Sequence, residues 1–139
     1  MSRLDTGIAS ESPMKLPSPL RLASPLSRLV FAGLILLVCW LAFSPHPPKG
    51  ANLGWDKANH ASAFVTLMLC AAWAWPRRLL WAAPGLVAYG GFIEIVQSFI
   101  PERDGEWLDL FADSVGIAIG LLLVHLARRL LHRRFTMQA

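Results

Sequence analysis

The chain alternates between long apolar blocks and short breaks that are rich in proline, glycine and charge. Four blocks occur, each roughly 15 to 22 residues long. A helix needs ~20 residues to cross the apolar core of a bilayer. We therefore expect an all-α, polytopic membrane protein built as a bundle of four transmembrane helices. The expected spans are residues 27–44, 59–75, 79–100 and 107–127.

Composition supports lipid rather than water as the solvent of this fold. Of 139 residues, 55% are hydrophobic and only 16% are charged, which is unusual for a soluble domain of this size. Residues 1–25 are rich in serine and proline and show no periodicity, so we expect a disordered cytoplasmic segment there. Residues 26–127 form the expected transmembrane domain, and residues 128–139 form a basic cytoplasmic tail.

The net charge of +4 gives a sequence pI near 9.7, but the placement of the basic residues does not indicate a nucleic-acid partner. Most of them precede the first span, separate spans two and three, or follow span four. Positive residues of short connections stay in the cytoplasm, so both termini are expected there. These residues are Arg3, Lys15, Arg21, Arg28, Arg77, Arg78, Arg128, Arg129, Arg133 and Arg134.

Polar residues gather at the opposite, extracytoplasmic ends of the spans. Asp56, Lys57 and His60 begin span two, and Asp56 and His60 are four apart, on one helical face. Glu94 and Gln97 are three apart near the end of span three. Glu94 is expected roughly 10 Å below that helix end. An ionisable group at such a depth normally faces the bundle interior, which makes Glu94 a candidate functional residue.

The fourth span begins with one continuous stripe. Asp109, Asp113, Gly116 and Gly120 recur at helical offsets, so two acids stand above a small-residue seam on a single face. A neighbouring helix that packs on the glycines would also meet the carboxylates. Arg103 of the preceding loop, together with Lys57 and His60, supplies cations to compensate them.

Structural explanations exist for the same residues. Asp56 and Asp109 stand at helix N-termini, where a carboxylate favours the helix dipole. Glu94 and Asp113 can each also take part in a structural ion pair with a nearby cation. The acids of the loop before span four are expected to be solvated, and the two cysteines to be buried without a disulfide. These residues are Glu102, Asp104, Glu106, Cys39 and Cys70.

Taken in order, these residues resemble the VanZ-like family of small bacterial membrane proteins, named after an accessory factor in glycopeptide (teicoplanin) resistance. The resemblance runs from position 56 to position 120, about 65 residues. It implies a multi-pass protein of the bacterial inner (plasma) membrane, for which the placement of the basic residues predicts N-in and C-in topology. The matching positions are Asp56, Lys57, His60, Phe64, Gly90, Glu94, Gln97, Pro101, Arg103, Asp109, Gly116 and Gly120.

One departure from the family pattern is clear. The family usually has asparagine where this chain has Asp113, so a neutral donor is replaced by a potential charge. The resemblance supplies no mechanism, covers neither the first span nor the tails, and leaves the oligomeric state open.

Three functions are compatible with this sequence. The favoured one is an envelope-associated, noncatalytic factor, resembling the glycopeptide-resistance protein, whose polar residues bind a lipid-linked or cell-wall component in the bilayer. In that interpretation no metal or cofactor is expected. The first alternative is a membrane-embedded hydrolase or transferase with His60 as a base oriented by Asp56, or with a metal on His60, Glu94 and Asp109. A small proton-coupled transporter ranks lowest, because no acid lies near the inner leaflet.

Overall fold

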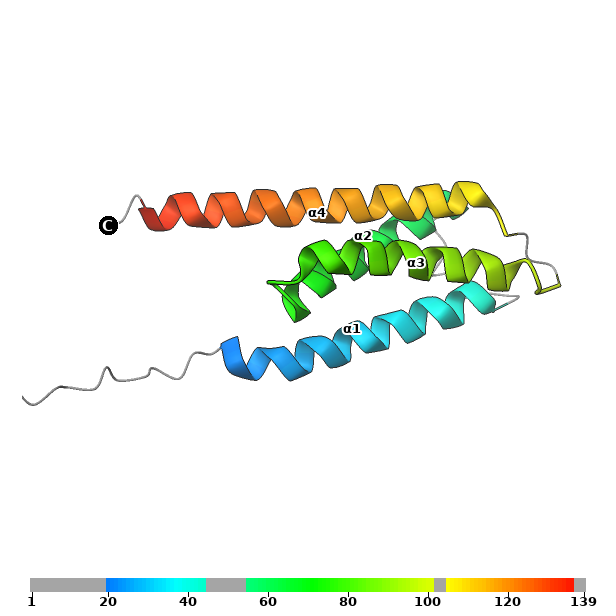
Figure 1. The fold of residues 1–139 in the computed structure, drawn as a ribbon, viewed down its shortest axis with the longest axis horizontal. Helices are drawn as coiled ribbons and strands as arrows, with labels where there is room; N and C mark the ends of the chain where they lie inside the picture. The colour runs from blue at the N-terminus through cyan, green and yellow to red at the C-terminus, as the bar shows by residue number, and fades with distance from the viewer. Residues whose placement is uncertain (1–19, 45–54, 102–104, 137–139) are drawn as a thin grey trace, which may run out of the picture.

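The computed structural model describes residues 20–44, 55–101 and 105–136, all built around four α-helices (Figure 1). They are α1 (Leu20–Phe43), α2 (Asp56–Ala74), α3 (Leu79–Gln97) and α4 (Trp107–Thr136). The expected all-α class is therefore confirmed for the described residues. The segments 1–19, 45–54, 102–104 and 137–139 lie outside the described residues. Most of the segment that was expected to be disordered, residues 1–25, therefore also lies outside them.

Two helices are longer than expected. α1 begins at Leu20, so residues 20–25 are helical although they were assigned to the disordered segment. Pro25 lies inside this helix, one turn after its start. A proline there lacks the N–H that would donate to the carbonyl four residues earlier, and its ring crowds that carbonyl. α4 continues to Thr136, through residues assigned to a basic tail. Figure 1 shows this last part of α4 running past the ends of α2 and α3.

α3 is shorter than expected, because it ends at Gln97 rather than at residue 100. Beyond that point the backbone tightens into turns, in which the N–H of Phe99 donates to the carbonyl of Val96 and that of Ile100 to the carbonyl of Gln97. Glu94 therefore lies within the last turn of α3, closer to the helix end than its distance from Pro101 predicted.

Three helices are long and apolar enough to cross a membrane by length and composition. These segments are Pro25–Phe43, Leu79–Gln97 and Trp107–Leu130. α2 has a comparable length but is less apolar, because its first turns carry Asp56, Lys57 and His60. The chain thus has the helices of a membrane protein, and a fourth span through α2 stays a prediction.

α2 lies at the centre of the bundle. It contacts each of the other three helices, and its longest interface is with α4. Both α2 and α4 begin at the same end of the bundle, where α1 and α3 finish (Figure 1). The core runs along α2 and joins α3 and α4. Its buried residues are Phe64, Leu67, Met68, Leu86, Ile93 and Ile117.

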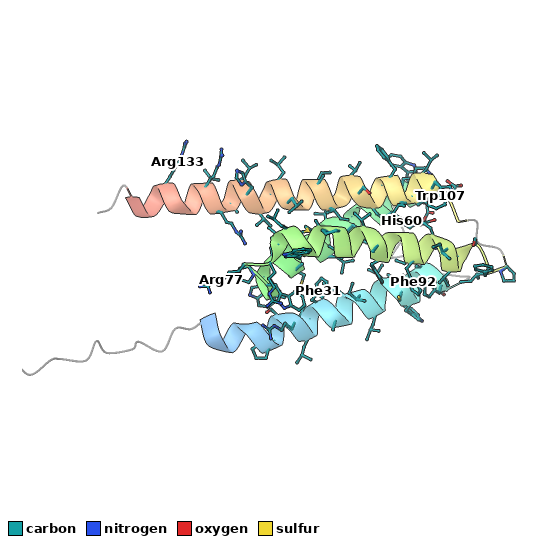
Figure 2. The ribbon with its side chains drawn as sticks, in the orientation of Figure 1. Phe31, His60, Arg77, Phe92, Trp107 and Arg133 are labelled. Atoms are coloured by element: carbon teal, nitrogen blue, oxygen red, sulfur yellow. The ribbon has the colours of Figure 1, made fainter. Side chains whose placement is uncertain are left out.

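The two ends of the bundle differ in chemistry. His60 and Trp107 lie at one end, which we call the polar end, and Arg77 and Arg133 lie at the other, the basic end (Figure 2). Every acidic side chain among the described residues belongs to the polar end. At the basic end, the Arg128 guanidinium donates to the carbonyl oxygen of Pro76 at 2.9 Å, which ties α4 to the turn between α2 and α3.

Candidate functional site

The polar end brings together side chains of three helices, which we call the polar cluster: Lys57, His60, Glu94, Asp109 and Asp113. Its carboxylates are buried, with exposed fractions of 4% for Glu94, 3% for Asp109 and 0% for Asp113. Lys57 and His60 come from α2, Glu94 from α3, and the two aspartates from α4. Residues far apart in sequence thus meet where α2 and α4 begin and α3 ends.

Glycines allow this close approach. A Cβ at Gly116 would meet the carbonyl oxygen of Ala61, and one at Gly120 would lie 2.6 Å from the Cβ of Met68. α2 therefore packs directly on the small-residue seam of α4, as small residues permit in membrane helices. The same face of α4 carries Asp109 and Asp113, so the seam and the carboxylates share one partner helix.

Gly90 allows an equally close approach of α3 to α2 and α4. A Cβ at this position would lie 2.5 Å from the Asp113 Oδ2 atom and 3.3 Å from the Phe64 ring. Because the position has no side chain, the Asp113 carboxylate can lie against the α3 backbone. All three glycines noted in the sequence thus border the polar cluster or the interface beneath it.

His60 lies at the centre of the polar cluster. Its Nδ1 atom is 3.0 Å from Asp113 Oδ1 and 3.9 Å from Glu94 Oε1. Its Nε2 atom is 3.9 Å from Asp109 Oδ2. Nδ1 therefore faces carboxylates of α3 and α4, whereas Nε2 faces the carboxylate one turn earlier on α4. Asp56, the partner expected from sequence spacing, is exposed, although its carboxylate also lies near His60 and Asp109.

Glu94 joins the end of α3 to the start of α4. The backbone N–H of Glu106, one residue before α4 begins, donates to Glu94 Oε2 at 2.9 Å. A carboxylate next to a helix N-terminus is favoured by the helix dipole. The chain passes so close that a Cβ on Gly105 would lie 2.5 Å from the Glu94 carbonyl oxygen.

Two carboxylate oxygens of the polar cluster have no hydrogen-bond partner among the described residues. They are Glu94 Oε1 and Asp113 Oδ2, and both are buried. Unpaired buried acceptors are uncommon in folded proteins and indicate a ligand, ion or proton. Two groups in this region place one ligand atom per residue within 4.8 Å of each other: Asp56, His60 and Asp109, and His60, Glu94 and Asp113.

Lys57 closes the cluster at its rim. Its Nζ atom lies 2.9 Å from Glu106 Oε2 and 3.3 Å from Asp109 Oδ1. The hydrogen bond to Glu106 raises the pKa of Lys57, and the same bond lowers the pKa of the Glu106 carboxyl. Both groups are therefore charged across the neutral range, and they bridge α2 to the start of α4.

Besides the exposed Asp56, two candidate residues are not placed in the cluster. Gln97 is buried, but its Nε2 atom donates to the carbonyl oxygen of Ala42 at 3.0 Å, so it joins α3 to α1. Arg103 lies outside the described residues. Glu106, which was expected to be solvated, is exposed, and in addition its carboxylate pairs with Lys57 while its backbone N–H donates to Glu94. In the sequence, the one indication of these contacts was that Glu106 directly precedes the helix that carries Asp109.

The fold and the site together define a class: a small helical membrane protein with buried charged groups at one end of its bundle. The VanZ/LLP1 family matches residues 51–128, and this chain belongs to that family. An uncharacterized protein of Schizosaccharomyces pombe is 34% identical over 116 residues, which cover 79% of this chain and 70% of the yeast protein. No solved structure matches the chain. The VanZ-like resemblance that was inferred from the sequence is thereby confirmed.

Proposed function

We propose that this protein is an envelope-associated membrane factor whose polar cluster binds the polar group of a lipid-linked component. In this proposal the chain crosses the bacterial inner membrane four times with both termini in the cytoplasm. The polar cluster then lies at the extracytoplasmic face. A glycopeptide-resistance-like role would follow if the component is a lipid-linked precursor of the cell wall.

One observation carries the proposal: Glu94 Oε1 and Asp113 Oδ2 are buried and lack partners among the described residues. A buried acceptor that stays unpaired costs about 1–3 kcal/mol. A hydroxyl, an amine or a bound cation of an incoming headgroup would offset that cost. Lys57, with 30% of its side chain exposed at the rim, is positioned to contact a phosphate or carboxylate of the same molecule.

The yeast relative favours a lipid-borne ligand over a soluble fragment of the bacterial wall. A component confined to bacterial cell walls would not account for a similar protein in Schizosaccharomyces pombe, whereas lipid headgroups are available in every membrane. If the apolar helices cross the bilayer, their ends, where the polar cluster lies, would be close to the level of such headgroups.

Catalysis by His60 is less well supported than binding. A general base needs a ring nitrogen directed at the substrate, but Nδ1 faces Asp113 and Glu94 while Nε2 faces Asp109. Proton-coupled transport has less support still, because the acids of the described residues all belong to the polar end. A proton path would need further titratable groups towards the basic end.

Lipid analysis of the purified full-length protein tests the proposal. Lipids that copurify with the wild type are extracted and quantified by mass spectrometry, and compared with Glu94→Gln and Asp113→Asn. We expect one polar lipid class to fall about tenfold in both variants, because each loses a charged acceptor. Thr66→Ala is the control, since its exposed hydroxyl donates to the carbonyl of Ser62 within α2 and lies outside the polar cluster. Unchanged lipid content in both cluster variants would overturn the proposal.

A further inference from the structure

We propose that His60, Glu94 and Asp113 hold a divalent transition-metal ion. The three side chains come from α2, α3 and α4, and one ligand atom from each lies within 4.8 Å of the others. A metal at this point would join three helices whose backbones are already in close contact. The inference does not require the proposed function, because a metal can bind here whether or not a lipid does.

The separations of the ligand atoms suit such an ion. His60 Nδ1 is 3.0 Å from Asp113 Oδ1 and 3.9 Å from Glu94 Oε1. Two ligands at about 2.0–2.1 Å from a zinc ion lie about 3.3 Å apart when the angle between them is tetrahedral. The observed distances lie on either side of that value, so small side-chain rotations are sufficient to complete the coordination.

An unpartnered oxygen, Glu94 Oε1, points to the same ligand independently. It is buried in a residue that is 4% exposed, has no hydrogen-bond partner in the described part of the chain, and faces His60. Asp113, whose Oδ1 atom faces His60, is 0% exposed. A hydrogen bond from His60 Nδ1 can serve one carboxylate at a time. A cation between the three groups would coordinate both carboxylates and offset their mutual repulsion.

The surrounding contacts orient the ligand atoms. Ligating histidines almost always direct their second ring nitrogen at a carboxylate or carbonyl. Here His60 Nε2 is 3.9 Å from Asp109 Oδ2, and Lys57 contacts the other oxygen of Asp109 at 3.3 Å. Glu94 is fixed in the same way, since its Oε2 atom accepts the N–H of Glu106 and leaves Oε1 directed at His60.

The donor set indicates the class of metal. One imidazole nitrogen with two carboxylate oxygens favours Zn²⁺, Fe²⁺ or Mn²⁺ over Ca²⁺ or Mg²⁺, which prefer oxygen ligands alone. Three protein ligands leave at least one coordination position open. A phosphate or hydroxyl oxygen of a polar headgroup is the kind of ligand that such a position accepts.

Metal titration of the full chain, purified in detergent without a histidine tag, tests the inference. Zn²⁺ is added to metal-stripped protein and followed by calorimetry, and Co²⁺ is added in parallel to record its d–d absorption. We expect one ion per chain and Co²⁺ bands of a four- or five-coordinate nitrogen and oxygen site. Glu94→Gln and Asp113→Asn should each weaken binding at least about 100-fold.

Thr66→Ala is the control, because its exposed hydroxyl donates to the carbonyl of Ser62 within α2 and belongs neither to the ligand set nor to the contacts that orient it. It should retain the wild-type affinity within about threefold, as expected for an exposed group. Circular dichroism and gel filtration establish that each variant is folded. The inference is overturned if the folded wild type binds no ion, or if it binds one as tightly after both substitutions. The two proposals can be distinguished: if the wild type binds metal but the Glu94→Gln and Asp113→Asn variants keep their copurified lipid, this inference stands and the proposed function is overturned.

Discussion

Helices α2 and α4 approach each other over glycines, whereas α1 lies on the outside of the bundle. At the α2–α4 interface, Gly116 and Gly120 leave no room for a side chain, and the carboxylates of the polar cluster are buried next to them. In α1, Ser27 is the one buried residue among those whose side chains are described. A Cβ added to Gly33 of α1 would have no neighbour within 4 Å.

The attachment of α1 depends on directional contacts instead of close backbone packing. The Tyr89 hydroxyl donates to the carbonyl of Ile35 at 2.7 Å, and Gln97 donates to that of Ala42. Phe31 also packs edge-on against Trp75. Lipid tails are as apolar as leucine, so helix association in a bilayer needs either small residues or polar bonds. The buried charges lie at the interface where backbone positions are most tightly fixed.

Among the substitutions that test this comparison, Gly116→Val should have the largest effect on the free energy of unfolding. The added Cβ would meet the backbone oxygen of Ala61, which cannot move without shifting α2. We expect the free energy of unfolding to fall by about 3 kcal/mol or the protein not to fold. The loss should appear in thermal unfolding in detergent, followed by circular dichroism.

Gly33→Val in α1 is the matched control, because the same side chain enters open space there. It should change the midpoint of unfolding by no more than about 2 °C. Equal losses in the two variants would show that α1 is packed as closely as α4, and the contrast between the two regions would be wrong.

The sequence could predict that the residues of the polar cluster lie together, because helical periodicity places the residues of each helix on a common face. Asp109, Asp113, Gly116 and Gly120 had to share a face, so a helix packed on the glycines had to meet the acids. His60 and Lys57 are the residues of α2 that do so. Block length and composition likewise predicted helices of membrane-spanning length in this chain.

Other features depended on contacts that no periodicity encodes. Gln97 lies one turn from Glu94 and shares its helical face, yet it bonds to α1. Which neighbouring helix meets each end of that face depends on packing in three dimensions. The end of α3 was placed too late because the apolar residues Phe99 and Ile100 continue the block, although their backbone is in turns.

Tyr89→Phe should loosen α1 and leave the α2–α4 interface intact. The substitution removes the hydroxyl that donates to Ile35 and keeps the ring. We expect a loss of about 1 kcal/mol, because one neutral hydrogen bond disappears. Hydrogen exchange measured by mass spectrometry should be faster in α1 and unchanged in α2 and α4. Faster exchange in α2 instead would contradict the separation of the two regions.

The smallest effect should come from the exposed contact between Lys57 and Glu106, which joins the ends of α2 and α4 at 2.9 Å. Lys57 lowers the pKa of Glu106, so this contribution is complete above the ordinary pKa of a glutamate and is lost as the pH falls through the lowered value. The raised pKa of Lys57 preserves it well into the alkaline range. Wild type should therefore unfold about 1 °C above Glu106→Gln at pH 7, and the two should converge as the pH falls through the lowered pKa of Glu106. A difference that grows on acidification would mean that Glu106 is stabilised in its protonated form, contrary to its contact with Lys57.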